Sequence, residues 1–329
     1  MTSKKRLVTA IISALGMLLL ILDSKTALSG AAEGLEMCIR TVIPSLFPFF
    51  VVSVVITSNL SGMEMKILRP LGSLCGLPVG AESLLAVGLL GGYPVGAQCI
   101  AQSFLKGNLT RKDAERMLGF CNNAGPAFLF GIASSLFTDK RVAWVLWVIH
   151  IISALTVGAI FKQKSQNKHV EVTQENTSLV HATKKAVNAM VGVCSWILIF
   201  RVVIAFIEKW FFWRMTQICQ TTIIGLLELA NGCSALGYIS NDSIRFIMCS
   251  GFLGFGGICV ALQTISVTEG LGMTWYFIGK ILQGCLSMWL AALISGYLPA
   301  YTLLLILPIL LFFKYKKTVA FQRKLVYNK

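Results

Sequence analysis

The sequence predicts an all-α, polytopic helical membrane protein with inverted repeats, two re-entrant hairpins and broken helices. Three observations support this fold class. Of 329 residues, 56% are hydrophobic and only 13% are charged, whereas soluble domains carry about 25% charged residues. The long apolar runs are interrupted by glycine, proline and polar residues, and the positive charges cluster between the runs. Lipid must therefore solvate much of the surface.

Ten apolar stretches alternate with polar segments, and most are long enough to cross about 30 Å of hydrocarbon. The first follows Lys4-Lys5-Arg6 and fits either a signal peptide or a membrane helix. We expect a retained helix, because no pair of small residues marks a cleavage site after it. The stretches are Leu7–Leu22, Met37–Leu60, Leu71–Phe104, Met117–Phe137, Val142–Phe161, Ala186–Ile207, Thr221–Ile239, Phe246–Val267, Met273–Ile294 and Tyr301–Phe313.

The stretches divide the chain into five segments. We predict an N-terminal transmembrane helix and external loop (1–36), a first repeat (37–161) and a cytoplasmic polar linker (162–185). A second, inverted repeat (186–296) follows, and a last transmembrane helix with a basic cytoplasmic tail (297–329) completes the chain.

Helix breakers and polar residues coincide within several runs. Backbone that leaves helical geometry in lipid must be buried in protein or line a wet cavity. Close helix packing explains the glycines alone, but it does not explain two adjacent asparagines before Gly-Pro. The interruptions are Gly91-Gly92-Tyr93-Pro94, Asn122-Asn123-Ala124-Gly125-Pro126, the group Glu228, Asn231 and Gly232, then Ser250-Gly251 and Gly254-Phe255-Gly256-Gly257.

The interruptions recur in the same order in both halves, which predicts that the second half is a shortened copy of the first. Three segments of the first half can be laid on three of the second. The pairs are Ile43–Phe50 with Val193–Phe200, Gly88-Leu89-Leu90 with Gly225-Leu226-Leu227, and Phe120-Cys121-Asn122-Asn123 with Met248-Cys249-Ser250-Gly251.

Charge distribution gives an independent test of this topology. If the first hairpin bends at Gly92-Tyr93-Pro94 and the second at Asn231-Gly232, the two halves run in opposite directions. Both chain termini are then cytoplasmic. Of the 29 Lys and Arg residues, 20 fall on the cytoplasmic side, seven outside, and Arg201 and Lys280 within spans. This bias follows the positive-inside rule, and the inverted plan is typical of secondary transporters.

The polar residues at the breaks form the candidate site for binding or gating a solute. Amide side chains offer both donors and acceptors, which suits a polar neutral solute; the alternative is that they cap the broken helix ends. Arg201 and Glu228 belong to adjacent elements of one repeat and are candidates for a functional pair; the alternatives are a structural ion pair or a side chain that snorkels to the membrane interface. The candidate residues are Tyr93, Pro94, Gln98, Asn122, Asn123, Gly125, Pro126, Glu228, Asn231 and Gln263.

Other classes of function lack a sequence signature. No nucleophile elbow, phosphate-binding loop, paired carboxylates or metal-spaced histidines occur within the runs, so we expect no enzyme, cofactor or metal site. The ten cysteines are scattered and are expected to be small buried hydrophobes. The net charge of +15 orients the protein in the membrane rather than binding nucleic acid, because the charges flank apolar runs.

Several of these segments resemble the YlbJ family of sporulation integral membrane proteins, which carries the nucleoside-recognition, or Gate, domain. The resemblance covers about residues 37–263. Two departures are a shorter chain and Ala261, where the family pattern suggests His. The matching segments are Ile43-Pro44-Ser45-Leu46-Phe47-Pro48-Phe49-Phe50, Gly91-Gly92-Tyr93-Pro94-Val95-Gly96-Ala97, Phe120-Cys121-Asn122-Asn123-Ala124-Gly125-Pro126 and Gly254-Phe255-Gly256-Gly257.

This resemblance implies an endospore-forming Firmicute and a role in spore formation, with spore cortex assembly as the expected process. It also implies kinship with Gate domains of concentrative nucleoside transporters and ferrous-iron transporters. We therefore expect a multi-pass protein of the cell membrane that binds or transports a small polar solute, nucleoside-like or a cell-wall precursor. The alternative is a non-transporting scaffold for spore-envelope assembly. Solute identity, direction, coupling ion and oligomeric state are left open.

Overall fold

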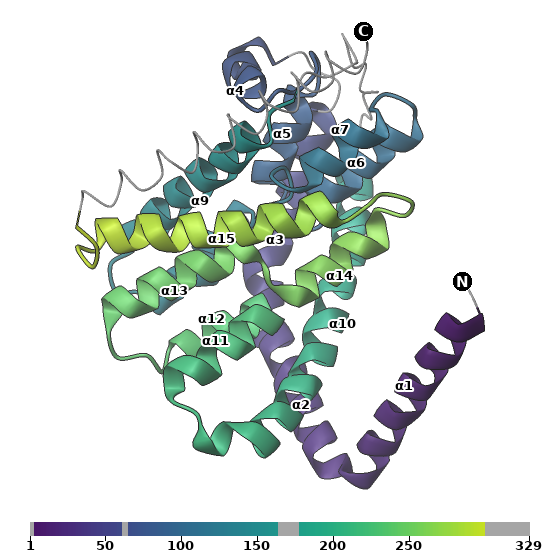
Figure 1. The fold of residues 1–329 in the computed structure, drawn as a ribbon, viewed down its shortest axis with the longest axis vertical. Helices are drawn as coiled ribbons and strands as arrows, with labels where there is room; N and C mark the ends of the chain where they lie inside the picture. The colour runs from purple at the N-terminus through teal and green to yellow at the C-terminus, as the bar shows by residue number, and fades with distance from the viewer. Residues whose placement is uncertain (1–2, 61–64, 164–177, 300–329) are drawn as a thin grey trace, which may run out of the picture.

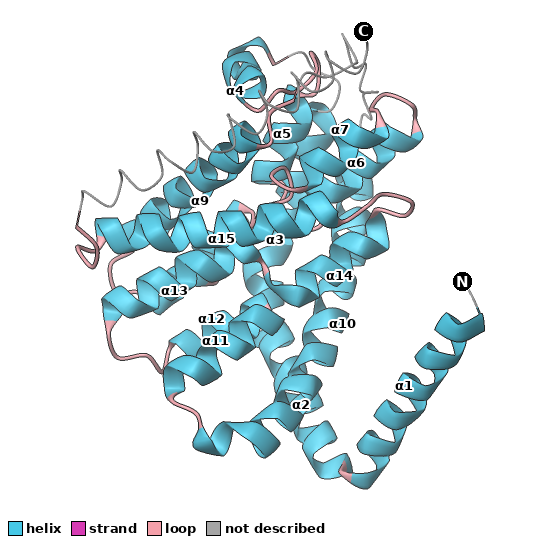
Figure 2. Cartoon of the chain, in the orientation of Figure 1, coloured by secondary structure: helices cyan, strands magenta, loops and turns pink. Residues whose placement is uncertain are grey.

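The computed structural model describes residues 3–60, 65–163 and 178–299, and the regular elements in these ranges are helices (Figures 1 and 2). The predicted all-α class is confirmed for these residues. The last predicted span, Tyr301–Phe313, lies outside them. The helices of the first half are α1 (Ser3–Leu22), α2 (Ser24–Met37), α3 (Ile43–Leu60), α4 (Arg69–Leu74), α5 (Glu82–Leu90), α6 (Val95–Leu105), α7 (Arg111–Leu118), α8 (Pro126–Gly131) and α9 (Arg141–Ile160).

The external loop predicted up to residue 36 is wrong, because residues 24–37 form helix α2. Asp23 begins this helix by accepting a hydrogen bond from the Thr26 backbone N–H at 3.4 Å, as an N-cap residue does. A π-helical turn, Cys38–Val42, then carries α2 directly into α3. The polar residues that suggested a loop lie along a continuous helix.

The second half is also broken into short helices. Ser178 caps α10 by accepting a hydrogen bond from the His181 N–H, so the end of the predicted linker is helical from Leu179. Residues 164–177 of the linker lie outside the described part. The helices are α10 (Leu179–Phe211), α11 (Gln217–Leu227), α12 (Leu229–Leu236), α13 (Asp242–Phe255), α14 (Gly257–Val267) and α15 (Thr274–Ile294).

Two helix pairs appear on opposite sides of α15 in Figure 1. Figure 1 shows α5 and α6 near the top and α11 and α12 toward the lower left, with α15 crossing between them. The α15 helix packs on α13 and α9, and α10 packs on α2 and α3. Glycines permit the close approach of α2 to α10: a Cβ on Gly30 would lie 3.1 Å from Val202 Cα, and one on Gly34 would lie 3.1 Å from Leu198 Cα.

Five helices in the described part are long and apolar enough to cross a membrane. Many of their large apolar side chains are exposed, as expected of a surface that lipid solvates. The shorter apolar helices include one leg of each pair, α6 at Val95–Leu105 and α11 at Gln217–Leu227. The five candidate spans are Ser24–Ile56, Arg141–Ile160, Leu179–Arg214, Asp242–Val267 and Thr274–Ile294.

The helix breaks fall close to the predicted positions, with two exceptions. The first run breaks at Gly91–Pro94, as predicted. The Thr221–Ile239 run breaks at Glu228, and the bend predicted at Asn231-Gly232 is wrong, because both residues lie inside α12. In the later run, Ser250-Gly251 stays inside α13, and the break comes at Gly256, where φ is 85°. A positive φ suits glycine because it has no Cβ. The sequence match of Asn122-Asn123 to Ser250-Gly251 therefore pairs residues at a helix break with residues inside a helix.

Candidate functional site

Two glycine contacts close the two helix pairs. On the α5–α6 pair, a Cβ added to Gly96 would lie 2.9 Å from Gly88 Cα and 2.2 Å from the carbonyl oxygen of Cys121. On the α11–α12 pair, a Cβ added to Gly232 would lie 2.3 Å from Gly225 Cα. Each pair is therefore a tight hairpin whose legs meet through glycine, and whose tip is presented to the interior.

The tips of both hairpins border one small cavity of about 50 Å³, called here the tip cavity. Gly91, Gly92 and Tyr93 come from the first tip. Glu228, Leu229 and Ala230 come from the second, and Gly125 and Gln263 complete the polar and backbone wall. Segments far apart in the sequence are thus brought together at the breaks, but the second tip predicted from the sequence, Asn231-Gly232, does not border this cavity.

Tyr93 ties the first tip to the second half of the chain. Its hydroxyl donates a hydrogen bond to the carbonyl oxygen of Leu253 at 3.2 Å. The same hydroxyl lies 3.0 Å from where a Cβ on Gly256 would stand. A side chain at this position of the α13–α14 break would crowd the Tyr93 hydroxyl.

Asn122 joins the first hairpin to α14. Its side-chain oxygen accepts a hydrogen bond from Ala97 N at 3.3 Å, and its amide nitrogen donates to Thr264 Oγ1 at 2.9 Å. The residue is fully buried and borders neither of the two cavities described here. Its bonds satisfy a helix N-terminus, which is the capping role weighed from the sequence.

Asn123 belongs to a second polar group around α15. Its amide donates to Phe120 O at 2.8 Å, while its side-chain oxygen accepts from Gln283 at 2.9 Å and from Lys280 Nζ at 3.3 Å. Lys280 Nζ also donates to Gln283 Oε1 at 2.8 Å. Sequence reasoning missed Gln283 and gave Lys280 no role. The signal was present, because two polar residues three apart in an apolar helix share one face.

Glu228 caps α12 instead of pairing with Arg201. Its carboxylate accepts hydrogen bonds from Ala230 N at 3.0 Å, Asn231 N at 2.6 Å and Asn231 Nδ2 at 2.8 Å. Arg201 instead pairs with Glu33 of α2 and with Glu208 at 2.9 Å. The predicted Arg201–Glu228 ion pair is wrong, because Arg201 pairs with carboxylates of α2 and α10 while Glu228 accepts hydrogen bonds from the start of α12.

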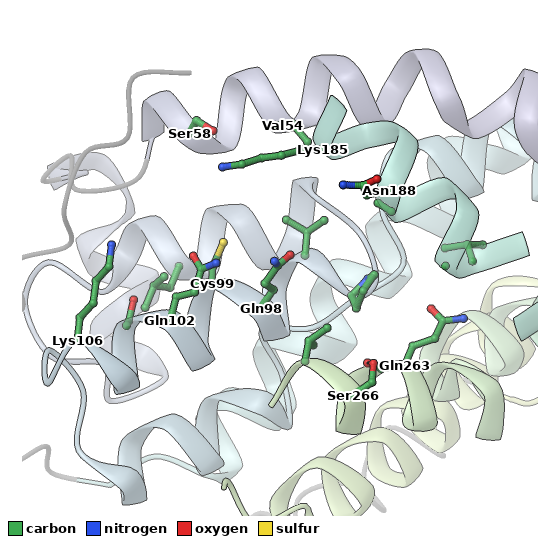
Figure 3. A pocket seen from close by; sticks show the side chains of 18 of the residues that line it. Val54, Ser58, Gln98, Cys99, Gln102, Lys106, Lys185, Asn188, Gln263 and Ser266 are labelled. Atoms are coloured by element: carbon green, nitrogen blue, oxygen red, sulfur yellow. The ribbon is translucent and has the colours of Figure 1, made fainter. Parts of the chain in front are cut away.

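A larger pocket of about 400 Å³ lies beside the tip cavity, and we call it the polar pocket. Figure 3 shows side chains from α3, α6, α10 and α14 around it. Of the predicted residues, Pro94, Gln98 and Gln263 line it. Sequence reasoning missed the remaining polar members, which are Ser58, Gln102, Ser103, Lys106, Asn108, Lys185, Asn188 and Ser266.

Gln263 and Val193 line both the polar pocket and the tip cavity. The two spaces are therefore adjacent, with the Gln263 side chain between them. Of the other predicted residues, Tyr93, Gly125 and Glu228 border the tip cavity alone, whereas Asn231 and Pro126 border neither space. The predicted constellation thus divides into residues that line cavities and residues that hold the breaks together.

A comparison with curated proteins supports the family resemblance. The chain is 24% identical over 172 residues to the sporulation integral membrane protein YlbJ of Bacillus subtilis (strain 168), which covers 50% of this chain and 41% of that protein. This chain is similar to a sporulation integral membrane protein. The match spans less than half of the relative's length. No protein-family model and no solved structure matches the chain.

The likeness and the five apolar helices together indicate a helical integral membrane protein. The Gate-domain assignment depends on the sequence motifs alone.

Proposed function

We propose that this protein is a sporulation membrane protein of the Gate type, which binds a small polar solute and moves it across the cell membrane during spore cortex formation. The observation that supports it most directly is the position of Gln263. This side chain stands between the polar pocket and the tip cavity. A solute entering the pocket would meet Gln263 next to both hairpin tips, which is the arrangement of a gated binding site.

The glycine contacts favour two equivalent re-entrant hairpins. Gly88 and Gly96 close the first as Gly225 and Gly232 close the second, and the sequence pairs Gly88 with Gly225. A third element also packs on each glycine pair, Cys121 on the first and Phe252 on the second, although the sequence match pairs Cys121 with Cys249. These contacts support an inverted repeat with its breaks meeting inside the protein.

The lining of the polar pocket favours a solute rich in hydrogen-bond acceptors. The amides of Gln98, Gln102 and Gln263 offer donors and acceptors. Lys106 and Lys185 add positive charge to the same wall, and the described lining contains no carboxylate. Nucleosides and cell-wall precursors fit this chemistry, and a phosphate or carboxylate on the solute would strengthen it.

The charge bias indicates which side the pocket opens toward. Lys106 and Lys185 both belong to segments that the positive-inside rule places in the cytoplasm. In this orientation the polar pocket faces the cytoplasm, and the tip cavity adjoins it at Gln263. Both chain termini are then cytoplasmic as well.

A non-transporting scaffold for spore-envelope assembly is the second candidate. Helix α1 favours it, because Figure 1 shows this helix standing apart from the bundle with its large apolar side chains exposed. A scaffold would not need a polar pocket bordered by two glycine-closed hairpins. We therefore rank solute binding first, without catalytic chemistry.

Thermal unfolding of the purified protein, with nucleosides, nucleoside monophosphates and cell-wall precursors added one at a time, tests the proposal. A bound solute should raise the melting temperature, because it stabilises only the folded state. Gln98→Leu and Gln263→Leu should remove the shift, whereas Gln217→Leu, an exposed position on α11, should keep it. Absence of any shift across these three solute classes, with the protein folded, would favour the scaffold.

A further inference from the structure

Lys280 is a buried amine with only neutral hydrogen-bond partners. The residue is 1% exposed on α15, and its Nζ donates to the side-chain oxygens of Gln283 and Asn123. Within the described residues no carboxylate forms an ion pair with it. An ammonium without a counter-charge in a membrane interior is costly, and such residues mark functional sites by default. A structural lysine would be expected to have an acidic partner.

The amine also faces the tip of the first hairpin. Lys280 Nζ lies 5.3 Å from the centroid of the Tyr93 ring, within the range of a cation–π interaction. This attraction exists only while the amine carries its proton. Tyr93 borders the tip cavity, so the charge of Lys280 acts directly on a wall of the proposed solute site.

The surrounding amides can accommodate both charge states of the amine. Gln283 Nε2 donates to Asn123 Oδ1 at 2.9 Å independently of Lys280. An ammonium has three N–H donors and a neutral amine has two, so both contacts to Gln283 and Asn123 survive loss of one proton. Deprotonation therefore removes the attraction to Tyr93 and leaves a lone pair on Nζ, while both hydrogen bonds that Nζ donates are kept.

We propose that Lys280 is a proton-binding site that controls the first hairpin. With the proton on Nζ, the ring of Tyr93 is held and the tip cavity stays closed. When the proton passes from Nζ to water, the ring is released and the tip of the hairpin moves more freely. The N–H bond alone breaks and re-forms. The coupling of solute movement to this proton rests on the proposed function, whereas the proton site itself does not.

Other titratable groups near Lys280 must be distinguished from it. His150 of α9 and Cys121 after α7 both interact electrostatically with the amine. Tyr93 faces it, and Tyr276 lies one helical turn earlier on α15. On the remaining sides, α7 presents Arg116, which is engaged by Asp113 and main-chain carbonyls, and α13 presents Ser250, Gly251 and Gly254 to α15. His150 is the strongest competitor, because neither ring nitrogen has a hydrogen-bond partner.

Hydrogen–deuterium exchange of the full chain in lipid nanodiscs tests the site without any solute. Exchange is followed for the first hairpin, residues 82–105, between about pH 6 and pH 11, a range that includes the ordinary lysine pKa of about 10.4. Labelling times are scaled so that intrinsic exchange is equal at each pH. We expect wild-type amides near Tyr93 to exchange about tenfold faster at high pH, in line with the loss of a buried cation–π contact. Amides of α10 serve as the internal reference.

Three variants separate a proton site from a structural lysine. Lys280→Arg keeps its charge throughout this range and should keep the hairpin protected at every pH. Lys280→Met has no charge and should leave the hairpin unprotected at every pH. His150→Gln should preserve the wild-type step.

A flat wild-type profile would overturn the proposal, and so would a step that survives in Lys280→Arg. Loss of the step in His150→Gln alone would assign the proton to His150. Should Lys280→Met fail to insert, wild type and Lys280→Arg still decide the outcome.

Discussion

Asn122 donates a hydrogen bond to the hydroxyl of Thr264 at 2.9 Å, across 142 residues of sequence. This bond joins the broken segment of the first half to α14 of the second. The same side chain accepts from Ala97 N in the first hairpin. One asparagine therefore holds three elements around the centre of the molecule, and its burial leaves no surface for a solute in the described state.

The first prediction concerns Asn122→Leu. Leucine cannot accept from Ala97 N, so a buried N–H loses its partner at a cost of about 1–3 kcal/mol. We expect a lower unfolding temperature and less folded protein in the membrane. The matched change Asn188→Leu, at an exposed position in the polar pocket, should leave stability nearly unchanged and weaken solute binding. Equal stability of both variants would contradict a capping role for Asn122 and favour a role in binding the solute.

The second prediction concerns the cap of α12. Glu228→Ala leaves the N–H groups of Ala230 and Asn231 without their acceptor, and loss of an N-cap costs about 0.5–2 kcal/mol. Because this cap is buried, we expect the upper part of that range in chemical unfolding. Thr216 caps α11 at an exposed site, where its hydroxyl accepts a hydrogen bond from Cys219 N. Thr216→Ala removes this cap. Its cost should be smaller, and an equal or larger cost would contradict the argument from burial.

Local rules were enough to predict two of the helix breaks, those at Gly92 and Gly256. Gly92 and Gly256 adopt positive φ, and Pro94 follows the first break, so the sequence marks these points directly. The two tips were also expected to meet inside the protein. Tyr93 and Glu228 border one cavity, whereas the predicted second tip, Asn231-Gly232, does not. The rest required knowledge of distant contacts.

Side-chain partners could not be read from local patterns. Arg201 pairs with Glu33, which is 168 residues away, and Lys280 reaches Asn123 across 157 residues. A single sequence gives no measure of such distances. The polar residues of α2 suggested a loop because composition alone does not distinguish an exposed helix from a turn. The polar pocket was missed because four helices that are far apart in the sequence contribute to it.

The third prediction concerns the membrane orientation of the linker. A cysteine at Gln166, which lies outside the described residues, should be labelled only from the cytoplasmic side. A cysteine at Trp213, which is 70% exposed, should be labelled from outside. Both variants belong in a background without native cysteines, and an impermeant maleimide on intact cells and inverted vesicles gives the readout. External labelling at Gln166 would reverse the topology and turn the polar pocket outward.

The last prediction tests the glycine closure of the two hairpins. A Cβ on Gly96 would lie 2.2 Å from the Cys121 carbonyl oxygen, and one on Gly232 would lie 2.3 Å from Gly225 Cα. Both neighbours are backbone atoms, so the helices themselves must move apart. Overpacking of this kind typically costs about 1–3 kcal/mol. We expect Gly96→Ala and Gly232→Ala each to lower the melting temperature in detergent.

Gly192→Ala provides the matched control, because nothing lies within 4 Å of a Cβ at that position of α10. Alanine there should be neutral or should stabilise the helix by about 0.5–1 kcal/mol. The two hairpin variants should also open their tips, which faster amide exchange at residues 91–94 and 228–231 would report. If the two losses of stability are similar, the hairpins are closed in equivalent ways, as an inverted repeat requires. A hairpin variant as stable as Gly192→Ala would show that its legs can separate freely, and the repeat would lose its main structural support.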